Sequence, residues 1–280
     1  MKNSILRRLF PFLTKENREL TSRDPNELYR EALIAIEGNN LKKAFRLFKG
    51  AALQGHAYAQ INLGLAYRYG KGTRVNRKKA FAWMAKAAEQ GNPKAQYNIA
   101  LYYGYGIGVK RDITETIRWF ELAAAQGHVK SLYKLGGLYY DDLYIPKDPQ
   151  KVFECYKKAA DLGYDLAIKE LGRCYDEGIG VEPNPSEAFR LYKKASDMGC
   201  PHAQYFLGRC YEFGIGTEPD PDLAYKYYKM ASMKNIRNAY YARGRCYAKG
   251  IGVPVDLEKA ETFKKKALFH HYQPKEDEKF

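Results

Sequence analysis

Small and apolar residues recur along the chain with helical spacing inside a longer repeat of 36 residues. Ala59, Leu63 and Tyr67 are spaced four residues apart and therefore share one face of a predicted helix over about 57–69. The same positions are filled by similar residues in each following period, without a gap. The tyrosine series is Tyr67, Tyr103, Tyr139, Tyr175, Tyr211 and Tyr247. A fixed period of this length predicts an all-α solenoid, in which each unit buries its apolar face only against its neighbours.

Each period also contains the signals that end one helix and begin the next. Two glycines follow the first helix, as in Gly70-Lys71-Gly72, and supply the positive φ angles that close it. An Asn or Asp then precedes a second predicted helix, over about 77–89 in this unit, and can cap its free amides. The capping residues are Asn40, Asn76, Asp112, Asp148, Asn184, Asp220 and Asp256. Because no strand precedes the glycines, they do not form a nucleotide-binding fingerprint.

The third period departs from this pattern. Asp142 and Tyr144 replace both loop glycines, and Pro146 follows them. We expect this loop to close differently from the others. A loop that breaks a pattern often carries function, and tolerated drift is the alternative explanation.

The N-terminal stretch from Met1 to Thr14 combines basic residues with a few large apolar ones. Arg7 and Arg8 interrupt the apolar run, so the stretch does not read as a signal peptide. We expect its apolar side chains to cover the open end of the first repeat, and an amphipathic membrane contact is the alternative.

Five cysteines are present, and three of them, Cys174, Cys210 and Cys246, are 36 residues apart. Equivalent helices in a stack lie more than one packing distance of about 8–10 Å apart. A disulfide needs Cα atoms within about 7 Å, so these thiols are expected to stay reduced. This pattern favours a cytoplasmic protein.

The net charge of +15 is concentrated near the start of the chain. Residues 1–86 contain 18 Lys and Arg against 6 Asp and Glu, and no acidic residue occurs from Gly38 to Ala88. This distribution predicts a docking surface for an anionic partner, which could be an acidic protein, nucleic acid or a membrane surface. A solvated basic face is the alternative. The candidate residues are Arg68, Lys71, Arg74, Arg77, Lys78 and Lys79.

A second candidate surface follows from the outward positions of the first helices. Positions equivalent to 61 and 65 are four residues apart, so they form one stripe rich in tyrosine and arginine. Both residue types are frequent in interface hot spots. The stripe consists of Tyr97, Tyr133, Tyr205, Tyr241, Arg173, Arg209 and Arg245. Alternatively, the arginines pair internally with acidic neighbours such as Glu170 and Glu212.

Nothing in the sequence has the spacing of a catalytic or metal site. The five histidines are scattered, and there is no HExxH, no CxxC and no serine in a G-x-S-x-G context. We therefore predict a protein that is not an enzyme and has no cofactor, and we expect a monomer.

Two stretches carry a resemblance to a known family. Residues 95–127 read AQYNIALYYGYGIGVKRDITETIRWFELAAAQG, and residues 203–232 read AQYFLGRCYEFGIGTEPDPDLAYKYYKMAS. They resemble the Sel-one-like repeat family, which is related to tetratricopeptide repeats. The resemblance implies a right-handed α/α superhelical solenoid that serves as an adaptor, as in bacterial members, with the first helices on its concave surface. A cysteine-rich branch linked to β-lactam hydrolysis has paired cysteines where this chain has Ala88 and Gln96, so that activity ranks third.

These observations divide the chain into three predicted parts. Residues 1–24 form a basic N-terminal segment, and residues 273–280 form a charged tail. Residues 25–272 form the solenoid, with an atypical first unit at 25–56 and six repeats at 57–272. The predicted function is a scaffold that binds a protein or peptide on its concave stripe, with binding of an anionic partner as the alternative.

Overall fold

The computed structural model describes residues 19–269, and their contacts group into two units that meet at Ser131 and Leu132. Unit 1 contains α3 (Pro25–Glu37), α4 (Leu41–Leu53), α5 (Ala57–Tyr69), α6 (Arg77–Glu89), α7 (Pro93–Tyr105) and α8 (Ile113–Ala125). Helix α9 (Val129–Tyr140) spans the division. Unit 2 continues with α10 (Pro149–Asp161), α11 (Asp165–Glu177), α12 (Pro185–Asp197), α13 (Pro201–Phe213), α14 (Pro221–Met233), α15 (Arg237–Lys249) and α16 (Leu257–Phe269). Every regular element in the described range is a helix, which confirms the all-α repeat fold.

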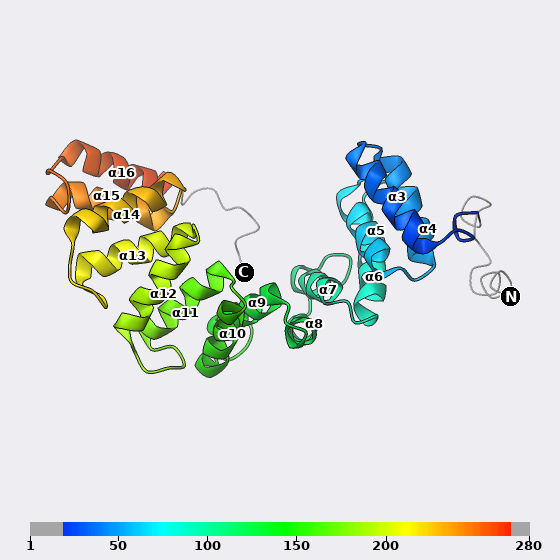
Figure 1. The fold of residues 1–280 in the computed structure, drawn as a ribbon, viewed down its shortest axis with the longest axis horizontal. Helices are drawn as coiled ribbons and strands as arrows, with labels where there is room; N and C mark the ends of the chain where they lie inside the picture. The colour runs from blue at the N-terminus through cyan, green and yellow to red at the C-terminus, as the bar shows by residue number, and fades with distance from the viewer. Residues whose placement is uncertain (1–18, 270–280) are drawn as a thin grey trace. The chain divides into compact units, whose positions relative to one another are not determined.

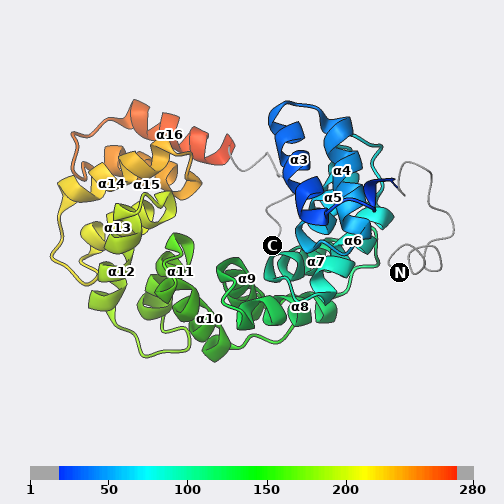
Figure 2. The same ribbon diagram turned by 45° about the vertical axis from the view of Figure 1, so that its right-hand side comes forward.

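Successive helices pack side by side in pairs within the units (Figures 1 and 2). The pairs are α3 with α4, α5 with α6, α7 with α8, α11 with α12, α13 with α14 and α15 with α16. The predicted helices over 57–69 and 77–89 coincide with α5 and α6. The predicted caps are present as well, since the Asn76 side chain accepts a hydrogen bond from the Lys79 amide at 2.9 Å. Local capping signals therefore set the helix bounds.

Within each unit, recurring tyrosines pack a first helix against the second helix that precedes it. The Phe45 ring meets Tyr67 edge to face, with centroids 5.3 Å apart and an interplanar angle of 88°. Phe189 meets Tyr211 in the same way, at 5.6 Å and 89°. Edge-to-face contacts are a favourable aromatic geometry, so the tyrosine series is part of the packing between repeats.

The second loop glycine permits a close approach between successive repeats. A Cβ on Gly72 would lie 2.1 Å from the Leu41 carbonyl oxygen, and one on Gly216 would lie 2.1 Å from that of Pro185. The loop therefore rests on the first turn of the preceding second helix with no room for a side chain. In the third repeat Tyr144 occupies this position, and the division between the units falls in α9, the helix that precedes that loop.

A glycine inside the first helix leaves room for its partner helix. A Cβ on Gly208 would lie 2.7 Å from the Tyr228 ring, and one on Gly172 would lie 2.9 Å from the Tyr192 ring. These tyrosines are fully buried. Each glycine costs about 1 kcal/mol of helix propensity relative to alanine, and it allows the tyrosine ring to pack against the helix backbone.

All five cysteines are free, including the three for which reduced thiols were expected, and Cys174, Cys210 and Cys246 are completely buried. Burial raises the pKa of the Cys174 thiol to about 12. No helix within residues 19–269 has the length and apolar character needed to cross a membrane. The predicted roles of residues 1–18 and of the tail at 273–280 lie outside the described residues.

Candidate functional site

The first helices of unit 2 bring arginine and aromatic side chains together across successive repeats. We call the surface formed by α9, α11, α13 and α15 the first-helix face. Arg173 of α11 lies over the Tyr140 ring of α9, with Cζ 4.4 Å from the centroid. Arg245 of α15 lies over the Phe213 ring of α13 at 5.3 Å. Each of these arginines therefore reaches back to the preceding first helix.

Arg245 also belongs to a polar network beneath this face. It pairs with Glu212 Oε2, and the Tyr228 hydroxyl donates a hydrogen bond to the same oxygen at 2.7 Å. The Glu212 side chain is only 7% exposed, whereas that of Arg245 is 29% exposed. Charge-assisted hydrogen bonds of this kind are stronger than neutral ones, so the network fixes the Arg245 guanidinium in place.

The equivalent positions one repeat earlier show how Arg209 differs. The Tyr192 hydroxyl is 3.4 Å from Asp176 Oδ2, which repeats the arrangement of Tyr228 and Glu212. Arg209 nevertheless forms no ion pair with any described residue, and its guanidinium lies 5.8 Å from the Phe206 centroid. Of the three predicted arginines, Arg209 is therefore the one whose charge is not matched by an acidic partner within residues 19–269.

The third arginine lies in a buried charged cluster on α11. Lys169 pairs with Glu170 Oε1, and Arg173 lies 3.2 Å from Glu170 Oε2. Lys169 and Glu170 are each 7% exposed. Burying charges has a large desolvation cost that good geometry only partly offsets. Because tyrosine occupies the position of Lys169 in most other repeats, this cluster is a local departure from the aromatic pattern.

The predicted outward orientation of the position equivalent to 61 is wrong for several of its residues. Ile61 is 2% exposed and Lys169 is 7% exposed. Tyr97, in unit 1, is half-buried because its ring packs on Phe120 at 5.6 Å and on His128 at 4.9 Å. His128, which covers Tyr97, lies just before the next first helix, and the sequence pattern of a single helix does not show that contact.

The other predicted tyrosines are also covered by aromatic neighbours until the last repeat. Tyr133 packs on Tyr156 and Tyr164, and burial raises its pKa to about 12. Tyr205 is half-buried against Tyr228. Tyr241 alone of the four is largely open, at 58% exposed.

Phe213 is an exposed aromatic residue that the sequence analysis missed. It is 56% exposed and lies one turn beyond Arg209 on α13. Its equivalents in the two adjacent repeats are charged, Glu177 and Lys249, and only the first two repeats have an aromatic residue there, Tyr69 and Tyr105. We call Arg209, Phe213 and Arg245 the Arg–Phe patch.

The predicted basic residues lie together at one edge of unit 1. Lys71 and Arg74 in the loop and Arg77, Lys78 and Lys79 in the first turn of α6 are exposed. Arg68 is half-buried and stacks on the rings of Tyr69 and Tyr102, at 5.0 and 5.3 Å. Within the described part of the chain, none of these six residues forms an ion pair. We call them the basic edge.

The histidines that the structure places in repeat turns have packing and capping roles. His56 Nδ1 accepts a hydrogen bond from the Ala59 amide at 3.1 Å, and His128 Nδ1 is 2.9 Å from Ser131 Oγ. Burial lowers the pKa of both histidines. Residues 19–269 contain no group of His, Cys, Asp and Glu side chains arranged to hold a metal ion.

Two solved structures are similar to this chain over most of its length. A Sel1 repeat protein from Oxalobacter formigenes shares 29% identity at a TM-score of 0.78, over 86% of this chain and 96% of that one. The Escherichia coli protein c5321, a protective antigen of uropathogenic strains with an SLR fold, shares 29% identity at a TM-score of 0.79. That match includes 91% of this chain but spans only 56% of the length of the antigen. A comparison with curated proteins gave no significant match.

The Sel1 repeat model matches the chain in seven consecutive segments. These segments are 34–56, 57–92, 93–128, 129–164, 166–200, 201–236 and 237–267. Together they include most of the chain, and their spacing is the 36-residue period described above. The chain belongs to the Sel1 repeat family.

Proposed function

We propose that this protein is a non-enzymatic scaffold, or adaptor, that binds a protein or peptide segment on the first-helix face of unit 2. Sel1 repeats are in general protein-interaction scaffolds. The observation that carries the proposal is the Arg–Phe patch, in which Arg245 lies over the 56% exposed Phe213 ring at 5.3 Å and Arg209 precedes Phe213 by one turn on the same helix. Aromatic and arginine side chains are the groups that most often dominate binding energy at interfaces.

The patch indicates the chemistry of its partner. Arg209 has no acidic partner within the described residues, so its guanidinium can grip a carboxylate of the ligand. Phe213 offers an apolar surface one turn away, and Arg245 is already held by Glu212. We therefore expect a ligand segment that places an Asp or Glu side chain close to a large apolar one.

Selection of a displayed random-peptide library against the full chain tests this proposal. Enriched peptides should combine an acidic residue with a large apolar one, and Arg209→Glu and Phe213→Ala should each weaken their binding roughly tenfold or more. Lys226→Glu is the matched control, because Lys226 is exposed on α14, the second helix of the same repeat. Peptides that bind Arg209→Glu and Phe213→Ala as tightly as the unchanged chain would contradict the assignment.

The basic edge supports a second candidate function, binding to nucleic acid or to an anionic membrane surface. Three consecutive cations, Arg77, Lys78 and Lys79, occupy the first turn of α6, where no acidic residue is present. The positive end of the helix dipole makes cations unfavourable there. The equivalent turn of α12 carries Glu187 instead. Because these three cations are unfavourable for the stability of α6, their presence there favours a role in binding.

Binding to a labelled oligonucleotide and to vesicles containing anionic lipid distinguishes the two sources of negative charge. The affinity should fall steeply with salt, because each neutralised phosphate releases counterions. Reversing Arg77, Lys78 and Lys79 to Glu should abolish binding, whereas reversing Lys226, Lys229 and Lys234 in unit 2 should not. A flat salt response, or equal losses in both variants, would contradict this function.

A further inference from the structure

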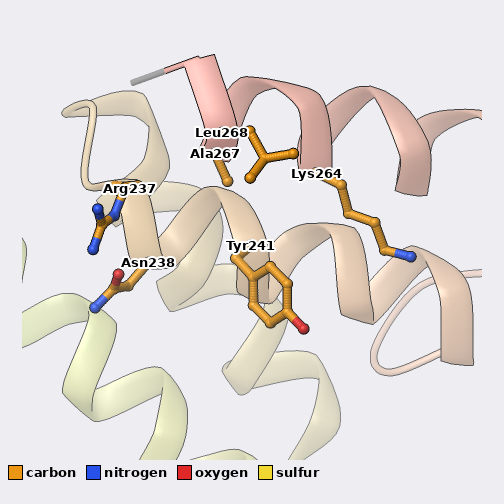
Figure 3. Close-up of a pocket in the computed structure, with 6 residues that line it drawn as sticks. All are labelled: Arg237, Asn238, Tyr241, Lys264, Ala267 and Leu268. Atoms are coloured by element: carbon orange, nitrogen blue, oxygen red, sulfur yellow. The ribbon is translucent and has the colours of Figure 1, made fainter. Parts of the chain in front are cut away.

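The last helical pair carries a groove that shares no lining residue with the Arg–Phe patch. A cavity of about 340 Å³ lies between α15 and α16 (Figure 3). Its lining residues are Arg237, Asn238, Tyr241, Lys264, Ala267 and Leu268. In Figure 3 the apolar side chains of Tyr241 and Leu268 lie between the two basic ones. Tyr241 is 58% exposed and Leu268 is 65% exposed.

The preceding repeat shows what kind of object fits this surface. There the equivalent residues lie on α13 and α14, and helix α15 packs against α14. Arg243 of α15 donates a hydrogen bond to Ser232 Oγ at 3.0 Å, and Ser232 and Ala231 are buried. Ser232 and Ala231 correspond to Leu268 and Ala267 in the last pair. The groove on α15 and α16 therefore corresponds to a surface that packs against a helix in the preceding repeat.

Leu268 indicates that the occupant is not another repeat in the same register. Every earlier repeat has a small residue at its position, which lets the next first helix approach closely. The series is Ala52, Ala88, Ala124, Ala160, Ser196 and Ser232. The larger Leu268 side chain would push a helix in that register outward. This argues against end-to-end stacking of a second copy in the repeat geometry.

The charge of the groove indicates which kind of helix can bind there. The two lining residues that carry a charge at neutral pH, Arg237 and Lys264, are cationic, and Lys265 and Lys266 follow on α16. No acidic residue lines the cavity. Complementary potentials give specificity and speed to association. We propose that this groove binds an acidic amphipathic helix of a partner protein, with small or apolar residues facing Tyr241 and Leu268.

Fluorescence anisotropy of the full chain with a designed peptide tests the proposal. The probe is a capped helical peptide of about 18 residues, long enough to form a marginal helix, with Ala and Leu on one face and Glu beside it. The reference peptide has Lys in place of each Glu. We expect the Glu peptide alone to bind, and Leu268→Glu and Lys264→Glu each to weaken it by roughly tenfold or more.

Leu257→Glu is the matched control, because Leu257 is 69% exposed on the same helix but does not line the groove. It should bind the Glu peptide as the unchanged chain does. Equal binding of both peptides, or binding that survives Leu268→Glu, would overturn the proposal. So would a concentration-dependent dimer that Leu268→Glu dissolves, since a second copy would then fill the groove. Binding that appears only after removal of residues 270–280 would assign the groove to the chain's own tail and would also overturn it.

Discussion

Arg245 of α15 and Glu212 of α13 form an ion pair across 33 residues of sequence, and the Tyr228 hydroxyl donates to the same carboxylate. This pair links two successive first helices beneath the face that we propose binds a partner. It therefore stabilises the stack of repeats and orients part of the Arg–Phe patch at the same time.

Glu212→Ala should lower the free energy of unfolding by about 2–4 kcal/mol, because it leaves a part-buried guanidinium and a buried hydroxyl without their acceptor. The comparison is Glu187→Ala. Glu187 forms an exposed pair with Arg190 on α12, and losing it should cost less than about 1 kcal/mol. Urea unfolding followed by circular dichroism measures both. Equal losses would show that the Glu212 network stabilises the fold no more than an exposed ion pair does.

Charge reversal at the three arginines should have unequal effects on stability. Arg173→Glu and Arg245→Glu place a carboxylate beside Glu170 or Glu212, so both should lower the melting temperature clearly. Arg209→Glu should leave the melting temperature nearly unchanged, because Arg209 has no ion pair within the described range. Thermal melts of the three single variants measure this difference, and a uniform loss would contradict the described pairing.

Two glycines with positive φ angles distinguish the cost of backbone strain from the cost of a steric clash with a neighbouring helix. Gly199 has a φ of +86° and no atom within 4 Å of an added Cβ, so Gly199→Ala should cost only about 1–2 kcal/mol. Gly216 has a φ of +68° and lies against the Pro185 carbonyl, so Gly216→Ala must also displace the loop. Denaturant unfolding should show a clearly larger loss for Gly216→Ala. Equal losses would mean that the loop does not rest on α12.

Acidification should weaken unit 1 through His56. Burial holds the pKa of His56 below its ordinary value of 6.5, so the unfolded chain takes up a proton more readily than the folded one. The contribution of neutral His56 to the free energy of unfolding is therefore fully present above pH 6.5, and it is lost as the pH drops below that value. Protonation also removes the Nδ1 acceptor used by the Ala59 amide.

His56→Asn provides the control for this pH dependence. Asn92 holds the equivalent position and caps α7 by accepting from the Ala95 amide at 3.1 Å. Asn at position 56 should thus keep the cap and remove the titration. Melting temperatures at pH 7.5 and 5.5 should differ less in His56→Asn than in the unchanged chain, and an identical difference would contradict the role given to His56.

The sequence predicted the helices well because their signals are local. Asn76 caps α6 through the Lys79 amide three residues later, so one short window contains both partners. Burial at the position of Tyr97 depends instead on His128, which lies at the far end of the same repeat, just before α9. The acidic partner of Arg245, Glu212, lies in the preceding repeat. Periodicity places a residue on a helix face, whereas these contacts depend on which residues distant parts of the chain supply.

The location of a bound peptide is the most direct test of the scaffold proposal. Benzoylphenylalanine placed at Phe213 on α13, or at Met233 on α14 as the control, would report contact by photocrosslinking to a library-selected peptide. Both side chains are exposed, so both variants should fold. We predict crosslinks from position 213 and none from position 233. Crosslinks from position 233 alone, or equally from both, would contradict binding on the first-helix face.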